Sequence, residues 1–152
     1  MKDWQINILN LLQWDNSSDE IKQGFKEVLE HNEYEYLMLP DSHPKSRENC
    51  MIAIQMLSDD DIAPYYDKLL SWMDDLNREG AELILYRLQK VTKNEDFISH
   101  LENAILKAYK QNRMDAIHNY SFLCDSYRAA LLSKQIKDIL EKTGNLISIE
   151  NF

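Results

Sequence analysis

The chain has 152 residues, of which 44% are hydrophobic and 28% charged, so it is long enough to bury a core of its own. Its net charge of −9 argues against binding to nucleic acid, because such binding depends on clustered Lys and Arg. Three glycines and three prolines are too few for the many turns of a sandwich or barrel. We therefore expect an all-α protein forming one domain over residues 1–152.

The beginning of the chain does not have the pattern of a targeting segment. Residues 1–5 carry acidic and amide side chains where a signal peptide needs an apolar core, and no apolar run approaches the roughly 18 residues of a membrane helix. We expect a cytoplasmic protein that does not bind membranes. Cys50 and Cys124 lie in apolar helical patterns without a C-x-x-C motif, which predicts reduced, buried thiols.

Three helix starts along the chain are alike. Residues 3–14 predict a leading helix, and after it an N-cap side chain with nearby acids precedes the first apolar residue three times. These caps are Ser17 with Glu20, Ser58 with Asp61, and Asn94. Each start continues into an apolar stripe with the spacing i, i+4, i+7: Ile21, Phe25, Val28; Ile62, Tyr66, Leu69; and Phe97, Leu101, Ala104.

A second set of helices begins with an arginine. In each, a small residue follows at +3 and apolar or aromatic residues at +7 and +10: Arg47, Cys50, Ile54, Leu57; Arg78, Ala81, Leu85, Leu88; and Arg113, Ala116, Tyr120, Leu123. The two sets predict three helical pairs, with residues 21–28, 62–69 and 97–104 in one layer and the arginine-led helices in the other.

The interval from the first apolar residue to the arginine is 16 residues in two pairs (62 to 78 and 97 to 113) and 26 in the first (21 to 47). The first pair therefore carries an insertion over residues 33–44, expected to be a loop with one short helical turn. Residues 129–142 predict a closing helix, and residues 145–152 a tail. The expected fold is a short HEAT-like α-α superhelix of three helical pairs with N- and C-terminal capping helices; the alternative is an irregular closed helical bundle.

Three segments carry a family resemblance: Pro44-Lys45-Ser46-Arg47-Glu48-Asn49-Cys50, Leu57-Ser58-Asp59-Asp60-Asp61-Ile62, and Leu70-Ser71-Trp72-Met73-Asp74-Asp75-Leu76-Asn77 with Gly80-Ala81. The chain resembles a family of small, uncharacterised bacterial all-helical domains of unknown function, over about residues 40–110. The resemblance implies HEAT-like helical pairs and no known activity. At Arg78-Glu79 the chain departs from the Trp-Pro that such proteins tend to have after the asparagine, so a role that this loop has in other members of the family is not expected to carry over to this chain.

The most polar junction in the middle of the chain is the segment 72–80. It offers a candidate partner-binding patch that consists of Trp72, Asp74, Asp75, Asn77 and Arg78. The structural alternative is that Asn77 caps the next helix while Asp74 or Asp75 pairs with Arg78. The repeated arginines likewise predict a ladder of ion pairs between units, or a row of guanidinium groups that binds carboxylates of a partner.

No motif points to a metal or a cofactor. Asp59-Asp60-Asp61 lacks the alternating ligands and central glycine of a calcium loop, and capping a helix explains it. The four histidines are isolated and have no zinc or di-iron spacing. His43 lies near Asp41 and Cys50, but Cys50 falls on a repeated core position. We expect neither a metal nor a cofactor.

Two functions are weighed. The leading hypothesis is a non-catalytic protein-binding module, and its more specific form is an immunity-type or toxin-neutralising protein whose acidic surface attracts a basic protein partner. The alternative is a small-ligand-binding protein or enzyme with a pocket under the 33–44 loop, where Tyr34, Tyr36, His43, Trp72 and Asp74 converge.

Overall fold

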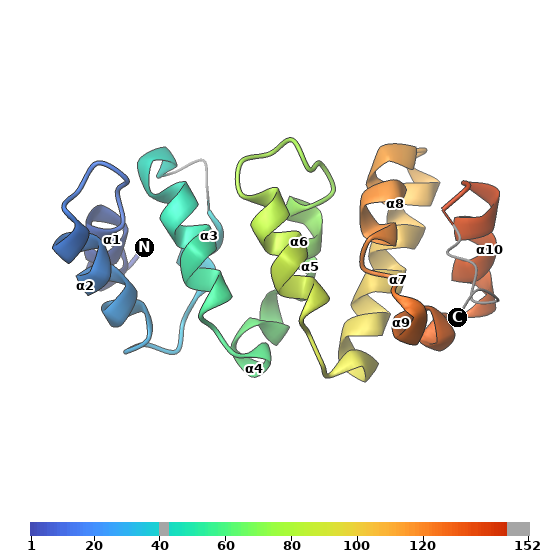
Figure 1. Ribbon diagram of the computed structural model, residues 1–152, viewed down its shortest axis with the longest axis horizontal. Coiled ribbons are helices and arrows are strands. Elements are labelled where there is room, and N and C mark those ends of the chain that lie inside the picture. Colours follow the sequence, from blue (N-terminus) through green and yellow to red (C-terminus); the bar gives the residue numbers. More distant parts are fainter. Residues whose placement is uncertain (40–42, 146–152) are drawn as a thin grey trace. The chain divides into compact units, whose positions relative to one another are not determined.

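The computed structural model describes residues 1–39 and 43–145 of the chain. The chain forms two compact units, the N-terminal unit of residues 1–65 and the C-terminal unit of residues 66–152. In both described ranges the regular elements are all helical, which confirms the all-α prediction (Figure 1). The described residues contain no helix that is long and apolar enough to span a membrane.

The N-terminal unit is built from short helices and 3-10 turns. They are α1 (Asp3–Leu11), α2 (Ser18–Val28), η1 (Glu35–Met38), η3 (Pro44–Ser46), α3 (Arg47–Gln55), α4 (Asp59–Ile62) and η4 (Ala63–Tyr65). Both capping boxes predicted in this unit are present: the amide of Glu20 donates to Ser17 Oγ at 3.2 Å, and that of Asp61 to Ser58 Oγ at 3.1 Å. These bonds satisfy amides that a helix start leaves without a partner.

The packing of α2 and α3 differs from the predicted first pair. α2 packs chiefly against α1, and α3 packs chiefly against η1, so the contact between α2 and α3 is the lesser one for both helices. The insertion does contain the expected short turn, η1, and its Tyr36, Leu37 and Met38 are buried. Residues of the insertion therefore contribute to the core instead of forming a surface loop, although residues 40–42 lie outside the described residues.

The C-terminal unit is arranged around its longest helix. Its helices are α5 (Tyr66–Trp72), α6 (Ala81–Gln89), α7 (Asn94–Lys110), α8 (Met114–Ser121), α9 (Ser126–Leu131) and α10 (Lys134–Lys142). α7 packs against α5, α8, α9 and α10, and α5 also packs against α6 (Figure 1). The unit therefore has α7 at its centre, with α5 and α8 as its main neighbours.

Two expected helices are interrupted. The predicted helix over 62–69 is divided into α4 and α5 by the 3-10 turn η4, which contains Pro64, a residue without the N–H that a helix interior requires. Ile62, Tyr66 and Leu69 are nevertheless buried, as the stripe predicts. The predicted closing helix over 129–142 is likewise two helices, because Ser133 caps α10 by accepting from the amide of Ile136.

The apolar positions of the arginine-led helices are confirmed as core. The residues at +3, +7 and +10 after each arginine are all buried in the structure. Cys50 and Cys124 are free, buried thiols, and desolvation by burial raises the pKa of each to about 12. Both cysteines therefore stay protonated at neutral pH. The predicted tail falls mostly on residues 146–152, which lie outside the described residues.

Candidate functional site

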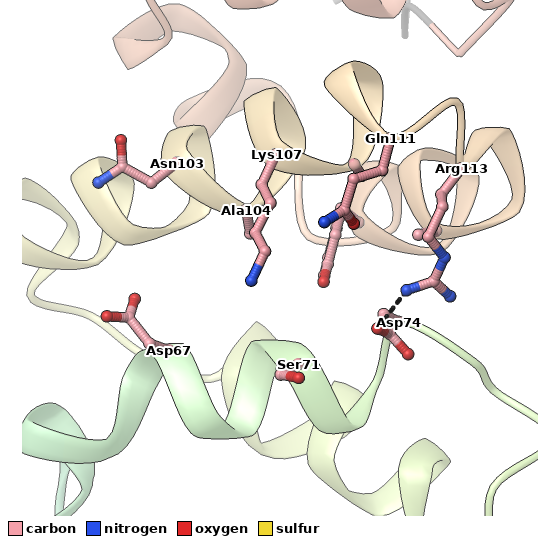
Figure 2. Close-up of a pocket in the computed structure, with 11 residues that line it drawn as sticks. Asp67, Ser71, Asp74, Asn103, Ala104, Lys107, Gln111 and Arg113 are labelled. Carbon is pink, nitrogen blue, oxygen red and sulfur yellow. Dashed lines mark hydrogen bonds and ion pairs between the residues drawn. The ribbon is translucent and has the colours of Figure 1, made fainter.

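A polar cavity of about 360 Å³ lies in the C-terminal unit between α5 and α7, next to the start of α8. One wall carries Asp67, Ser71 and Asp74 from α5 and the residues that follow it, and the other carries Asn103, Lys107 and Gln111 from α7 and its C-cap. Figure 2 shows the two walls facing each other, with Lys107 and Gln111 pointing from the α7 side toward α5. Arg113 closes the end at α8.

Helical periodicity explains why polar side chains line both walls. Asn103, Lys107 and Gln111 are spaced four residues apart, so they share one side of α7, while Leu101 and Ile105 on another side are buried. The cavity exists because the remaining lining positions are mostly small. Ala104, Ala108 and Ala116 leave space where larger side chains would bring the helices into contact.

Asp74 is the most tightly held side chain of the cavity. Arg113 Nη1 donates to Asp74 Oδ2 at 2.6 Å, and Arg78 Nη1 lies 2.8 Å from Oδ1 in an ion pair. The backbone carbonyl of Asp74 also accepts from Asn119 Nδ2 on α8 at 2.9 Å. Asp74 is 7% exposed, so its two arginines compensate a charge that has left bulk water.

Asp74 contributes to the raised pKa values of two neighbouring side chains, Arg113 and Tyr120. The hydrogen bond to Asp74 raises the pKa of Arg113, which therefore stays charged. Burial and the charge of Asp74 together raise the pKa of Tyr120 to about 12, and its hydroxyl donates to the carbonyl of Leu70 at 3.1 Å. Tyr120 is thus a neutral phenol at physiological pH and ties α8 to α5.

The other end of the cavity is more open to solvent. His100 Nδ1 lies 2.7 Å from Asp67 Oδ1, and the Asp67 side chain is 78% exposed. Lys107, Asn103 and Gln111 are exposed at the surface of α7 and its C-cap. No side-chain hydrogen bond or ion pair joins any of these three to another part of the described chain. They are available to a ligand.

The candidate partner-binding patch does not form one exposed surface. Trp72 and Asp74 are buried, Asp75 is half-buried, and Asn77 and Arg78 are exposed. Trp72 donates through Nε1 to the carbonyl of Glu79 at 3.2 Å. A contact patch needs exposed side chains, so the prediction is wrong for Trp72 and Asp74, and the carboxylate of Asp74 is held by Arg78 and Arg113.

The predicted pairing of Asp74 with Arg78 is confirmed, but Asn77 does not cap α6. Gly80 holds that position at a φ of 84°, and the amide of Asn77 instead donates to Asp75 Oδ1 at 2.9 Å. Asn94 also differs from expectation. It is the first residue of α7, and its Oδ1 accepts from Arg128 Nε at 2.9 Å.

The arginine ladder is formed in part. Arg78 and Arg113, which the sequence places at equivalent positions of two predicted pairs, share one carboxylate, that of Asp74. Arg78 also donates to the carbonyl of Ser71 at 2.9 Å, which caps the end of α5. Arg47 belongs to the N-terminal unit. Within the C-terminal unit the ladder is structural.

The five residues expected under the 33–44 loop belong to both units: Tyr34, Tyr36 and His43 to the N-terminal unit, and Trp72 and Asp74 to the C-terminal unit. Tyr34 and Tyr36 are buried in the N-terminal unit, and the ring of Tyr36 lies edge-on to Trp4 with centroids 5.4 Å apart. Burial raises the pKa of Tyr36 well above its usual range. Among those five residues, Asp74 lines the described cavity and the other four do not.

Sequence interpretation did not find Asp67, Asn103, Lys107 and Gln111 as site residues. A signal was present, since Asp67, Ser71 and Asp74 recur at i, i+4 and i+7 beside the apolar stripe, and Asn103, Lys107 and Gln111 recur at i, i+4 and i+8. A polar face is usually simply solvated, however. These residues can be identified as site residues only when it is known that the polar faces of α5 and α7 lie opposite each other.

The polar contacts of the cavity are mostly ion pairs. Its two carboxylates are paired with Arg78, Arg113 and His100, and among the described residues no hydroxyl of the cavity is held by a histidine. Nowhere in the described ranges do three or more His, Cys, Asp or Glu side chains lie close enough to bind a metal ion.

A comparison of the chain with protein-family models, with curated proteins and with solved structures gave no match. The resemblance to a bacterial helical family therefore stays a prediction.

Proposed function

We propose that this protein is a non-catalytic protein-binding module whose contact surface is centred on the cavity between α5 and α7. The observation that carries the proposal is the combination of a fixed charged cluster with uncommitted polar groups in one open cavity. Asp74, Arg78 and Arg113 are held by ion pairs, while Lys107 and Gln111 point into the space between the helices (Figure 2). Such a surface has a defined shape before a partner arrives.

The character of the cavity favours a protein partner over a small molecule. Small-ligand pockets are mostly apolar and enclose most of their ligand, within roughly 300–1,000 Å³. This cavity, at about 360 Å³, is lined largely by polar and charged side chains, and five of them are exposed: Asp67, Ser71, Asn103, Lys107 and Gln111. A cavity of this size and polarity has room for one or two side chains of a partner protein.

The charge of the whole chain supports a more specific form of this proposal. A net charge of −9 on 152 residues speeds encounter with a basic protein through long-range attraction. Small size and an acidic surface suit an immunity-type protein that neutralises a basic toxin in the cytoplasm. A HEAT-like stack of helical pairs would supply the extended surface that such binding needs.

Site-specific photo-crosslinking tests the proposal. A photoreactive residue at Asn103, on the rim of the cavity, is expected to crosslink a defined protein from a lysate of the source cells. The matched control places the same residue at Glu82, which is exposed on α6 and does not line the cavity. Capture from position 103 but not from position 82 supports the proposal, whereas equal capture from both positions, or capture from neither, contradicts it.

A further inference from the structure

We propose that the cavity between α5 and α7 accepts a carboxylate side chain, Asp or Glu, of the partner protein, with Lys107 as its anchor. This inference rests on the proposed function, and it adds the chemistry of the group that the partner inserts. It also differs from what the overall charge suggests, since an acidic protein is here inferred to bind an acidic side chain at the centre of its contact surface.

The first support is the state of Lys107. Its ammonium group points into the cavity from α7 (Figure 2), and it makes no ion pair with any residue in the described ranges. A lysine ammonium is a compact charge with three donors. Lys107 is therefore a cation whose bonding capacity is open at the place where a ligand would sit.

The second support is that both lining carboxylates are already engaged. Asp74 is bound by Arg78 and Arg113, and Asp67 by His100. Arg78, Arg113 and Lys107 are three permanently charged cations in and beside the cavity, and Asp67 and Asp74 are its two carboxylates. Of the three cations, Lys107 and Arg113 line the cavity, while Arg78 lies beside Asp74 without lining the cavity. Because Arg78, Arg113 and His100 already engage the two carboxylates, Lys107 is the lining cation that remains open to an entering anion.

The third support is the set of neutral donors around Lys107. The Gln111 amide points into the same space, and the Ser71 hydroxyl faces it from α5 (Figure 2). Neither side chain is hydrogen-bonded elsewhere in the described chain. A carboxylate has two oxygens and about four lone-pair sites, so an ammonium, an amide N–H and a hydroxyl together satisfy it better than one lysine alone.

The global and the local charge have separate roles in this proposal. Long-range attraction depends on the net charge and sets how fast a basic partner arrives. Contact chemistry depends on the few groups within hydrogen-bond distance and sets which side chain is accepted. A basic partner with an acidic side chain at the centre of its interface fits both.

The test uses the full chain and small probes that carry single side chains. Capped glutamate (N-acetyl-glutamate N-methylamide) is titrated at constant ionic strength while the side-chain amide signals of Gln111 and Asn103 are followed by NMR. Capped glutamine and capped lysine serve as the neutral and cationic probes. We expect saturable shifts of the Gln111 signal with the glutamate probe, and binding about fivefold weaker with Lys107→Met, the upper range for one exposed ion pair.

The matched control variant is Lys110→Met. Lys110 lies on α7 and is exposed like Lys107, but it does not line this cavity, so its loss is expected to leave glutamate binding within about twofold. Thermal melting of both variants shows that the fold is retained. The proposal is overturned if the lysine or glutamine probe shifts Gln111 as strongly as glutamate does, if no probe shifts it, or if both variants weaken binding equally.

The two proposals fail in distinguishable ways. Glutamate binding that depends on Lys107, together with no protein crosslinked from position 103, supports the carboxylate site and contradicts the protein-binding function. A defined protein crosslinked from position 103, together with no preference for glutamate, supports the function and overturns the carboxylate inference.

Discussion

The two units differ in whether charged side chains are buried in their interiors. In the N-terminal unit, none of the described residues with a charged side chain is buried, and the buried polar residue Ser46 donates its hydroxyl to the carbonyl of Leu9. In the C-terminal unit, Asp74, Arg87 and Arg128 are all buried. The interior of the N-terminal unit is therefore almost entirely apolar, whereas the interior of the C-terminal unit also contains charged side chains.

The difference shows where a binding site can be built. A buried charge is expensive unless several partners compensate it, so the helices around it must be placed accurately. In the C-terminal unit this requirement fixes the ends of α5 and α8 around Asp74, which also lines the cavity. Stability and binding therefore depend on some of the same groups in that unit.

Arg128 is expected to give the largest loss of stability. The residue is 2% exposed, and its guanidinium donates to the carbonyls of Leu88 at 2.7 Å, Val91 at 2.9 Å and Leu123 at 3.1 Å. Arg128→Met leaves these buried acceptors without that donor, so the free energy of unfolding should fall by about 3 kcal/mol. Urea denaturation measures the change.

The control for Arg128 is Lys134→Met at the exposed start of α10, which should change the free energy of unfolding by less than about 0.5 kcal/mol. A loss at Arg128 no larger than that of the control would show that the buried guanidinium contributes little. Apolar packing would then account for the stability of the C-terminal unit as it does for that of the N-terminal unit.

Asp74→Asn is expected to have the next largest effect. The substitution keeps the shape but removes the charge shared by Arg78 and Arg113, leaving the two guanidinium groups to repel each other. Because both arginine side chains are partly exposed, water compensates some of the loss, and we expect a fall of about 2 kcal/mol in the free energy of unfolding.

Asp75→Asn is the matched control for Asp74, since the neighbouring carboxylate is half-buried and its Oδ1 accepts from the Asn77 amide, a bond that asparagine can keep. It should cost less than about 0.5 kcal/mol. Equal losses of stability at the two positions, measured by thermal melting, would contradict the conclusion that the ion pairs of Asp74 with Arg78 and Arg113 stabilise the unit.

The smallest predicted effect lies in the N-terminal unit, at Gly24 on α2. A Cβ there would lie 2.7 Å from Leu12 Cδ2 and 3.2 Å from Leu11 Cβ, closer than ordinary van der Waals contact. Gly24→Ala therefore forces α1 and α2 apart, while the better helix propensity of alanine offsets about 1 kcal/mol of that cost. We expect a net loss of about 1 kcal/mol in chemical denaturation.

Gln23→Ala is the matched control for Gly24, because Gln23 is exposed on the same helix and alanine should be neutral there. Stabilisation by Gly24→Ala would show that α1 can move without cost. The close packing of α1 on α2 would then not be a constraint in this unit.

Local signals in the sequence predict much of the helical content. The caps at Ser17 and Ser58 are present as expected, and the apolar stripes are mostly buried, with Ile21, Phe25 and Ala104 half-buried. Each of these features depends on neighbours within a few residues. The breaks at Pro64 and Ser133 have local signals as well, a proline and a capping serine, and they were outweighed by an apolar periodicity that continues across them.

The partner of each polar side chain does not follow from local sequence. Asn94 has the pattern of a cap yet binds Arg128, which lies 34 positions away, and Asp74 is clamped by Arg113 across 39 positions. Both outcomes depend on which helices are neighbours in the folded unit. For the same reason Lys107 and Gln111 look like solvated surface until α5 faces α7.

The sequence by itself determined that this protein is all-α, where most of its helices start, and which faces of them are buried, because capping and apolar periodicity act within one or two turns. Tertiary structure alone decided that η1 packs on α3, that Asp74 is buried between two arginines, and that a polar cavity lies between α5 and α7. These features arise from contacts between residues distant in the chain, and their energies depend on burial and on neighbouring charge.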